Sequence, residues 1–186
     1  MLDGYFQEEP QPKALEGAPG GFGQMMAYVD EASFKHRWRF NLKTGETIEK
    51  HLDERILEFG MFNQKWAGRP YRYAYSTTTK PGWFLFNGYV KHDLRSGESW
   101  QLHLPEGRYA SESPFVPRIG ATDEDDGYLI SFITDENTQS SESILIDCKR
   151  FNEGPIVRIA LPHKISSGTH SAWADRDFLE NGYTAG

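Results

Sequence analysis

The sequence predicts an all-β protein built from propeller blades. Aromatic residues make up 14% of the chain, which also holds 18 glycines and 10 prolines, and this mixture favours a turn-rich β protein. Runs that alternate like strands are separated by tight turns. The turn glycines Gly45, Gly97 and Gly154 recur after 97 − 45 = 52 and 154 − 97 = 57 residues. About 50 residues is the spacing of propeller blades, each a small antiparallel sheet.

Residues 1–27 are expected to form an irregular segment leading into the blades, because prolines and a glycine pair interrupt them. Three hairpins are expected after this segment. The first has a strand over residues 38–42, a turn at 43–45 and a returning strand at 46–49. The second has a long aromatic strand within 82–94 before the turn at 93–98, and the third has a strand at 143–148, a looser connection at 149–154 and a strand at 155–160.

Hairpins of this kind also recur in a simple meander, so the repeat alone leaves that alternative open. Propellers typically have about 4–8 blades, and this chain has room for only about three. An incomplete ring would leave unpaired strand edges. We therefore expect the chain to be part of a larger propeller.

Composition excludes several classes of function. The formal net charge is −7 without a block of Lys or Arg, which argues against binding to nucleic acid. No apolar run approaches the roughly 18 residues of a transmembrane helix, and the polar N-terminus does not resemble a signal peptide. The single cysteine, Cys148, excludes an internal disulfide and, in its apolar run, is expected to be a buried structural thiol. A cytoplasmic protein is the expectation.

Six histidines are candidates for chemistry, but most have a simpler explanation. His36 and His51 flank the first hairpin among basic residues and are expected to face solvent. His92 and His103 lie at strand ends, where a structural or surface role is expected. None has the spacing of a helical His-Glu-x-x-His zinc site. His170 differs, because small residues precede it and Trp173 could shield it from water, although a core histidine stays the alternative.

Two carboxylates are placed between apolar neighbours. Glu58 lies between Leu57 and Phe59, and Glu112 lies in the segment 111–116. A buried carboxylate needs a hydrogen-bond donor, and the N–H of a metal-bound histidine is one such donor. The alternative is that either carboxylate faces solvent from a strand edge.

The acidic run at residues 123–127 suggests calcium, but it lacks the ligand spacing of an EF-hand. A solvated turn before a strand at 128–134 is the preferred interpretation. The chain contains no nucleophile elbow, Walker loop or dinucleotide fingerprint.

Four segments in order resemble the carotenoid cleavage oxygenase and lignostilbene dioxygenase family, from about Tyr28 onward. Residues 57–63 with 68–75 resemble the Glu-Phe-Pro-x-Ile-Asn segment and its Arg-Tyr-x-Tyr continuation. Residues 112–118 resemble Glu-Pro-x-Phe-Val-Pro-Arg, and 124–129 resemble Glu-Asp-Asp-Gly. Residues 161–173 resemble the closing segment, often Phe-His-Gly-x-Trp. The Ser-Gly-Thr-His form at 167–170 is more similar to the lignostilbene branch.

The resemblance implies the C-terminal blades of a seven-bladed β-propeller, with residues 1–186 as part of that single domain. It also implies an iron(II) ion, Fe(2+), on the propeller axis, held by four histidines. His170 matches the fourth ligand, Glu112 the carboxylate that orients this histidine, and Glu58 a carboxylate that serves another ligand. His163 matches no ligand position, and no catalytic residue is identified.

The chain departs from the family in two kinds of position. Gly60 and Ser113 stand where prolines are common, which suggests shifted turns. The other three histidine ligands have no counterpart in this sequence, so the N-terminal remainder of the propeller is implied.

The activity implied is cleavage of an alkene C=C bond by O2 into two carbonyl products. A stilbene- or phenylpropene-like substrate is the leading expectation, a small hydrophobic aromatic alkene. The alternatives are an apocarotenoid or carotenoid, or a catalytically inactive propeller fragment. The chain by itself is expected to be inactive.

Overall fold

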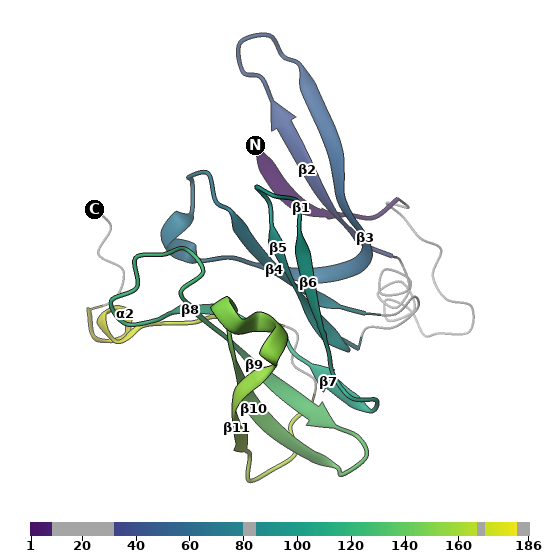
Figure 1. Cartoon of the computed structure of the whole chain (residues 1–186), viewed down its shortest axis with the longest axis vertical. Coiled ribbons are helices and arrows are strands. Elements are labelled where there is room, and N and C mark those ends of the chain that lie inside the picture. Colours follow the sequence, from purple (N-terminus) through teal and green to yellow (C-terminus); the bar gives the residue numbers. More distant parts are fainter. Residues whose placement is uncertain (9–31, 80–84, 167–169, 182–186) are drawn as a thin grey trace, which may run out of the picture.

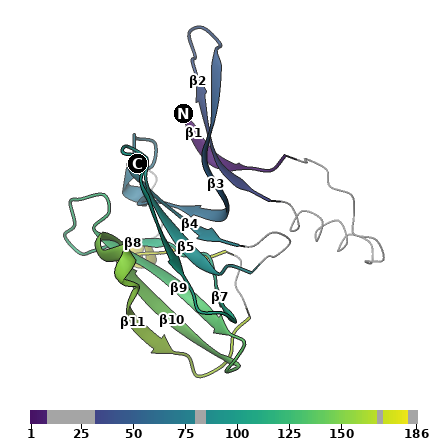
Figure 2. The same cartoon turned by 45° about the vertical axis from the view of Figure 1, so that its right-hand side comes forward.

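The computed structural model of this chain describes residues 1–8, 32–79, 85–166 and 170–181. These residues form two antiparallel sheets that lie one above the other in both views (Figures 1 and 2). The all-β prediction is therefore confirmed. The elements are β1 (Leu2–Phe6), β2 (Phe34–Phe40), β3 (Thr47–Met61), η1 (Gln64–Trp66), β4 (Tyr73–Thr78), β5 (Gly88–Asp93), β6 (Ser99–His103), β7 (Arg108–Ala110), β8 (Phe115–Pro117), β9 (Gly127–Asp135), β10 (Ser140–Asp147), η2 (Cys148–Glu153), β11 (Pro155–Ala160) and α2 (Arg176–Asn181).

The first sheet follows chain order from β1 to β6. Its centre is β3, a strand of 15 residues that pairs with β2 through its first part and with β4 through its last part. The strands β3 to β6 therefore make a four-stranded meander, and β1 and β2 extend it. The β2–β3 hairpin projects away from the rest of the molecule (Figure 2).

The second sheet has the order β11, β10, β9 and β7, and β8 also pairs with β9. β7 pairs with the end of β9 near Thr134, whereas β8 pairs with the end near Leu129. Together β7 and β8 occupy one strand position that is interrupted between Ala110 and Phe115. This second meander is the other four-stranded unit, and the interruption is where Glu112 lies.

The three turn glycines that carry the sequence repeat adopt the same backbone conformation. Gly45, Gly97 and Gly154 have φ angles of 78°, 82° and 80°, a region that residues with a Cβ rarely enter. The strand expected at 155–160 is β11, and the looser connection before it is the 3-10 helix η2. The repeat therefore marked the turns correctly.

The core lies where the two sheets meet. Tyr75 of β4 stacks on Phe115 of β8 with ring centroids 5.7 Å apart. Leu129 and Cys148 pack in the same buried cluster, at 1% and 0% exposure. The expected burial of the Cys148 thiol is confirmed, and burial raises the pKa of this thiol to about 12, so the thiolate is a minor form at neutral pH.

The acidic turn before β9 fastens one sheet to the other. Glu124 Oε1 accepts hydrogen bonds from the backbone N–H groups of Arg72 and Tyr73, both at 2.6 Å. Asp125 Oδ2 accepts from the buried Nζ of Lys91 at 2.7 Å. The prediction of a simple solvated turn was wrong in this respect: the strand follows as expected, but these carboxylates satisfy donors of the neighbouring sheet.

The irregular segment expected at 1–27 also needs correction at its start. Leu2–Phe6 forms β1 and pairs with β2 in the register Leu2↔Trp38 to Phe6↔Phe34. The paired residues are 28 to 36 positions apart in the chain, so no local pattern revealed this strand. Residues 9–31, which hold the prolines of that segment, lie outside the described residues.

Within the described ranges, no helix has the length and apolar character needed to cross a membrane.

The packing predicts which leucines support the fold. We expect Leu129→Ala to lower the free energy of unfolding by about 2–5 kcal/mol, because it opens a cavity in the core. The matched control Leu42→Ala changes a side chain that is 96% exposed and should alter stability by less than about 0.5 kcal/mol. Urea unfolding followed by tryptophan fluorescence measures both. Equal effects of the two substitutions would contradict the position of the core.

Candidate functional site

Glu112 is held in the interruption between β7 and β8. Its neighbour Ser111 donates its backbone N–H to the carbonyl of Phe132 at 3.0 Å and accepts the N–H of Phe132 on its hydroxyl at 3.2 Å. Ser113 donates its hydroxyl to the carbonyl of Ser111 at 3.1 Å. The segment is buried and bonded on both sides of Glu112, so the carboxylate is supported by a rigid backbone.

This carboxylate meets the segment that contains His170. Glu112 Oε2 lies 3.3 Å from Nδ1 of His170 and accepts the backbone N–H of Ser171 at 2.6 Å. The Ser171 hydroxyl also donates to the carbonyl of Glu112 at 2.8 Å. His170 itself is 82% exposed on its side chain, whereas Glu112 is 11% exposed. The structure therefore brings these two sequence candidates together, with Nδ1 of the imidazole toward the carboxylate.

Phe59 joins the site, and sequence reasoning did not single it out. Its ring lies 5.5 Å from that of His170 and 4.7 Å from that of Phe86. Phe59 has a φ of 50°, at the register shift of β3 between Glu58 and Met61. A bulge of this kind redirects side chains and is common beside functional sites. The sequence signals that could have found it were the glycine that follows it and its place in the segment 57–63.

The surroundings of Gly60 explain why a glycine stands where the family commonly has a proline. A Cβ at this position would lie 2.6 Å from the hydroxyl oxygen of Tyr5. The phenol of Tyr5 bonds to the Ser76 hydroxyl at 2.7 Å, so it cannot easily move away. Proline, which has a Cβ, does not fit beside this tyrosine without a shift of β1.

Glu58 lies next to Phe59 but has a different partner. Its Oε1 accepts the hydroxyl of Ser33 at 2.5 Å, and its backbone carbonyl accepts the hydroxyl of Thr77 at 3.0 Å. Among the described residues, no hydrogen bond or ion pair joins Glu58 to Glu112 or His170. Glu112 and His170 therefore lie together, whereas Glu58 is connected to this pair only through its neighbour Phe59.

The contact between Glu112 and His170 fits one histidine ligand of a metal ion and the carboxylate that supports it. A carboxylate beside one imidazole nitrogen, with the other nitrogen left for a metal, is the usual support of a histidine ligand. The pair His170 and Glu112 meets this description. Among the residues that the structure describes, no group of three or more His, Cys, Asp or Glu side chains could hold a metal ion. The complete donor set is therefore not contained in this part of the chain.

The other histidines have structural surroundings, and one prediction about them was wrong. His36, expected to face solvent, is 4% exposed and packs against the rings of Phe6, Trp38 and His51. Phe6, which packs on this ring, belongs to β1, a strand that the sequence did not indicate. His51 is exposed, as expected.

His92 is buried and bonds through Nε2 to Asp53 at 2.7 Å. Burial lowers the pKa of His92, and Asp53 opposes this only in part. His103 and His163 are exposed. Among the described residues, no hydrogen bond, ion pair or ring contact joins the five other histidines to His170 or Glu112.

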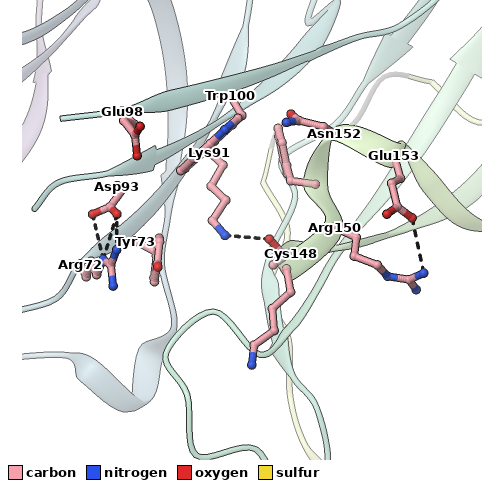
Figure 3. Close-up of a pocket in the computed structure, with 12 residues that line it drawn as sticks. Arg72, Tyr73, Lys91, Asp93, Glu98, Trp100, Cys148, Arg150, Asn152 and Glu153 are labelled. Atoms are coloured by element: carbon pink, nitrogen blue, oxygen red, sulfur yellow. Dashed lines mark hydrogen bonds and ion pairs between the residues drawn. The ribbon is translucent and has the colours of Figure 1, made fainter. Parts of the chain in front are cut away.

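A cleft with a volume of about 530 Å³ lies between the first sheet and η2 (Figure 3). Tyr73 and Trp100 line it, and Nζ of Lys91 lies 4.4 Å from the centroid of the Tyr73 ring. The same Nζ donates to the carbonyl of Cys148 at 2.7 Å, and Arg72 pairs with Asp93 at 2.5 Å. Its lysines and arginines pair with carboxylates of the cleft or with Asp123 and Asp125 of the acidic turn. The cleft is therefore a joint between the two sheets, and neither His170 nor Glu112 lines it.

The chain is similar to known proteins of one family. The family model described as "Retinal pigment epithelial membrane protein", RPE65, matches residues 4–175. A carotenoid 9,10(9′,10′)-cleavage dioxygenase 1 of Pisum sativum is 36% identical over 160 residues, covering 78% of this chain and 29% of that protein. An apocarotenoid-15,15′-oxygenase of Synechocystis sp. is 35% identical over 146 residues, covering 74% of this chain and 29% of that protein.

The structure agrees with these sequence relationships. A cobalt-substituted Synechocystis apocarotenoid oxygenase superposes with a TM-score of 0.72 and 27% identity, covering 77% of this chain and 30% of that one. The chain thus spans about 30% of the length of the relatives that it matches. Its two meanders are blades of a seven-bladed β-propeller, as the resemblance implied. The chain belongs to the RPE65 family, whose members include the carotenoid cleavage oxygenases.

Proposed function

We propose that this chain supplies part of an iron-dependent oxygenase that cleaves an alkene C=C bond of an apocarotenoid or carotenoid into two carbonyl products. The observation that carries the proposal is the distance of 3.3 Å between His170 and Glu112. The sequence resemblance implies that these residues are the fourth ligand and its supporting carboxylate. Bound ferrous iron would supply the activation of dioxygen.

The residues of this chain would orient one histidine ligand of the iron. Glu112 faces Nδ1 of His170, which holds the ring orientation and leaves Nε2 for the metal. Ser171 fixes the distance between the two segments through its two hydrogen bonds to Glu112. Phe59 covers one edge of the imidazole ring and provides an apolar wall beside it. Glu58 would serve another ligand, in line with its separate hydrogen bonds.

The relatives favour a carotenoid-type substrate over the stilbene-type substrate that the sequence suggested. The two curated relatives described above are named for carotenoid and apocarotenoid cleavage. The stilbene expectation came from the Ser-Gly-Thr-His form, and its first three residues, 167–169, lie outside the described residues. Nothing in the described residues supports a site for a phenol.

Substrate preference is tested with a longer form of the protein that supplies three further histidine ligands. We expect cleavage of an apocarotenal at least about tenfold faster, in kcat/KM, than cleavage of a hydroxystilbene, since an extended polyene gains more apolar burial. Product aldehydes are identified by chromatography and mass spectrometry. Faster cleavage of the hydroxystilbene would return the assignment to the lignostilbene branch.

The 186-residue chain alone should neither hold iron tightly nor cleave a substrate. One imidazole gives weak affinity, because tight sites rely on several ligands positioned in advance. The test reconstitutes the purified chain with iron(II) under reducing conditions and measures bound metal and turnover of an apocarotenal. Stoichiometric iron with turnover would show that this chain contains a complete site and that the proposed donor set is wrong.

Glu112→Gln in the longer form should reduce iron affinity or turnover by about 10–100-fold, the range for the loss of a group that supports a metal ligand. The amide is nearly the same size but carries no negative charge. Glu54→Gln, a change at an exposed position of β3, is the matched control and should leave both unchanged. Iron titration and kcat are the measurements. Unchanged iron content and turnover in Glu112→Gln would make Glu112 a purely structural carboxylate.

A further inference from the structure

His36 is a buried histidine whose ring nitrogens are without hydrogen bonds. The residue is 4% exposed, and among the described residues neither Nδ1 nor Nε2 has a hydrogen-bond partner. Nε2 lies 3.5 Å from Oε2 of Glu49, which is close enough for attraction but does not form a hydrogen bond. A buried polar atom without a partner is destabilising, and a bound ion is one of the groups that can satisfy it.

A second imidazole lies beside this ring. His51 of β3 is the direct cross-strand neighbour of His36 on β2. The two ring centroids are 4.8 Å apart, and the ring planes are inclined by 76°. Zn–N bonds are about 2.0–2.1 Å long and each ring centre lies about 1.2 Å beyond its nitrogen, so two imidazoles on one ion have centres about 5 Å apart. The observed separation therefore suits one ion shared by the two histidines.

The charge on this face of the strands favours a cation. Alternation along β2 and β3 places His36, His51 and Glu49 on the same face. Glu49 has the only formal charge among the paired residues of β1, β2 and β3 on that face. The basic side chains of the same paired segments alternate to the opposite face, namely Lys35, Arg37, Arg39 and Lys50. A positive ion beside His36 would therefore meet one carboxylate and no competing cation of these strands.

Aromatic rings surround the imidazole of His36. The ring centroid of Trp38 lies 4.4 Å from that of His36, and the ring centroid of Phe6 lies 5.3 Å from it. An apolar shell of this kind limits the access of water, and it strengthens the attraction between an ion and its ligands.

We propose that His36 and His51 form a binding site for a divalent transition-metal ion of the class that prefers imidazole, such as Zn2+. Each ring donates one nitrogen to the ion. Among the described residues no group of three or more His, Cys, Asp or Glu side chains could hold a metal ion, so water supplies the remaining ligands and Glu49 contributes its charge. The site lies apart from His170 and Glu112 and does not depend on the proposed oxygenase function.

The ion reaches the site from the side of His51. The β2–β3 hairpin projects away from the rest of the molecule, His51 is exposed, and the Glu49 side chain is 56% exposed (Figure 2). Exposed side chains change rotamer within picoseconds to nanoseconds. Rotation of the His51 ring therefore opens a path to His36 without separating the strands.

The test is a titration of the folded 186-residue chain with zinc chloride at neutral pH. Long-range 1H–15N NMR spectra follow the imidazole nitrogens, and calorimetry gives the affinity and the stoichiometry. We expect the ring nitrogens of His36 and His51 to shift together and to saturate at one equivalent of Zn2+. The dissociation constant should be on the order of 10 µM, weaker than for a site with four protein ligands. His163, an exposed single histidine, should shift only at higher concentrations.

His51→Gln removes one ligand from an exposed position and should weaken the binding of Zn2+ by at least about tenfold. The matched control His163→Gln should bind as the unchanged chain does. Circular dichroism confirms that both variants are folded. Full affinity in His51→Gln, or unshifted nitrogens of His36 at saturating Zn2+, would overturn the proposal.

A third variant separates this site from the candidate iron ligand. His170→Gln should leave the binding of Zn2+ at His36 and His51 unchanged. Loss of the one-equivalent binding in His170→Gln would assign the ion to His170 and would also overturn the proposal. None of these measurements involves iron or turnover, so their failure is separate from failure of the proposed function.

Discussion

The rest of the structure depends on one constraint. The carboxylates of the acidic turn at residues 123–127, in the second sheet, accept hydrogen bonds from the first sheet. One carboxylate oxygen of Glu124 accepts two backbone N–H groups at the start of β4, and Asp125 neutralises the buried ammonium of Lys91. Charge-assisted bonds of this kind are short and directional. They fix the position of β9 relative to β4, and the core contact between Tyr75 and Phe115 follows from that position.

With the blades fixed in this way, the candidate site forms where regular strands are interrupted. Glu112 lies in the break between β7 and β8, and Phe59 lies at the register shift of β3. A regular strand would point these side chains alternately to the two faces of its sheet. The interruptions free them from that alternation, and both reach His170 as a result. Interrupted backbone thus gives the site its geometry, and the regular strands around it give the site its rigidity.

Two buried lysines show how surroundings set the chemistry of a side chain. Lys91 has a carboxylate, a carbonyl and an aromatic ring around its ammonium, so it serves as a charged joint between blades. Lys35 has its ammonium 5.4 Å from the centroid of the Tyr5 ring, and Asp3 and Asp53 accept hydrogen bonds from arginines. Lys91 is therefore a structural cation between the sheets, whereas burial lowers the pKa of Lys35.

The sequence by itself determined what depends on neighbours in the chain. Alternation gave the strands, and turn glycines such as Gly97 gave the blade spacing, because a positive φ is a local demand that glycine meets. The order of motifs also identified Glu112 and His170, which the structure joins, although their role toward iron stays a prediction. Tertiary structure decided what depends on distant partners. It added Leu2–Phe6 as a strand, buried His36 against the ring of Phe6 from that strand, and gave Phe59 a place beside His170. Each of these contacts joins residues far apart in the chain, and local periodicity carries no information about such pairs.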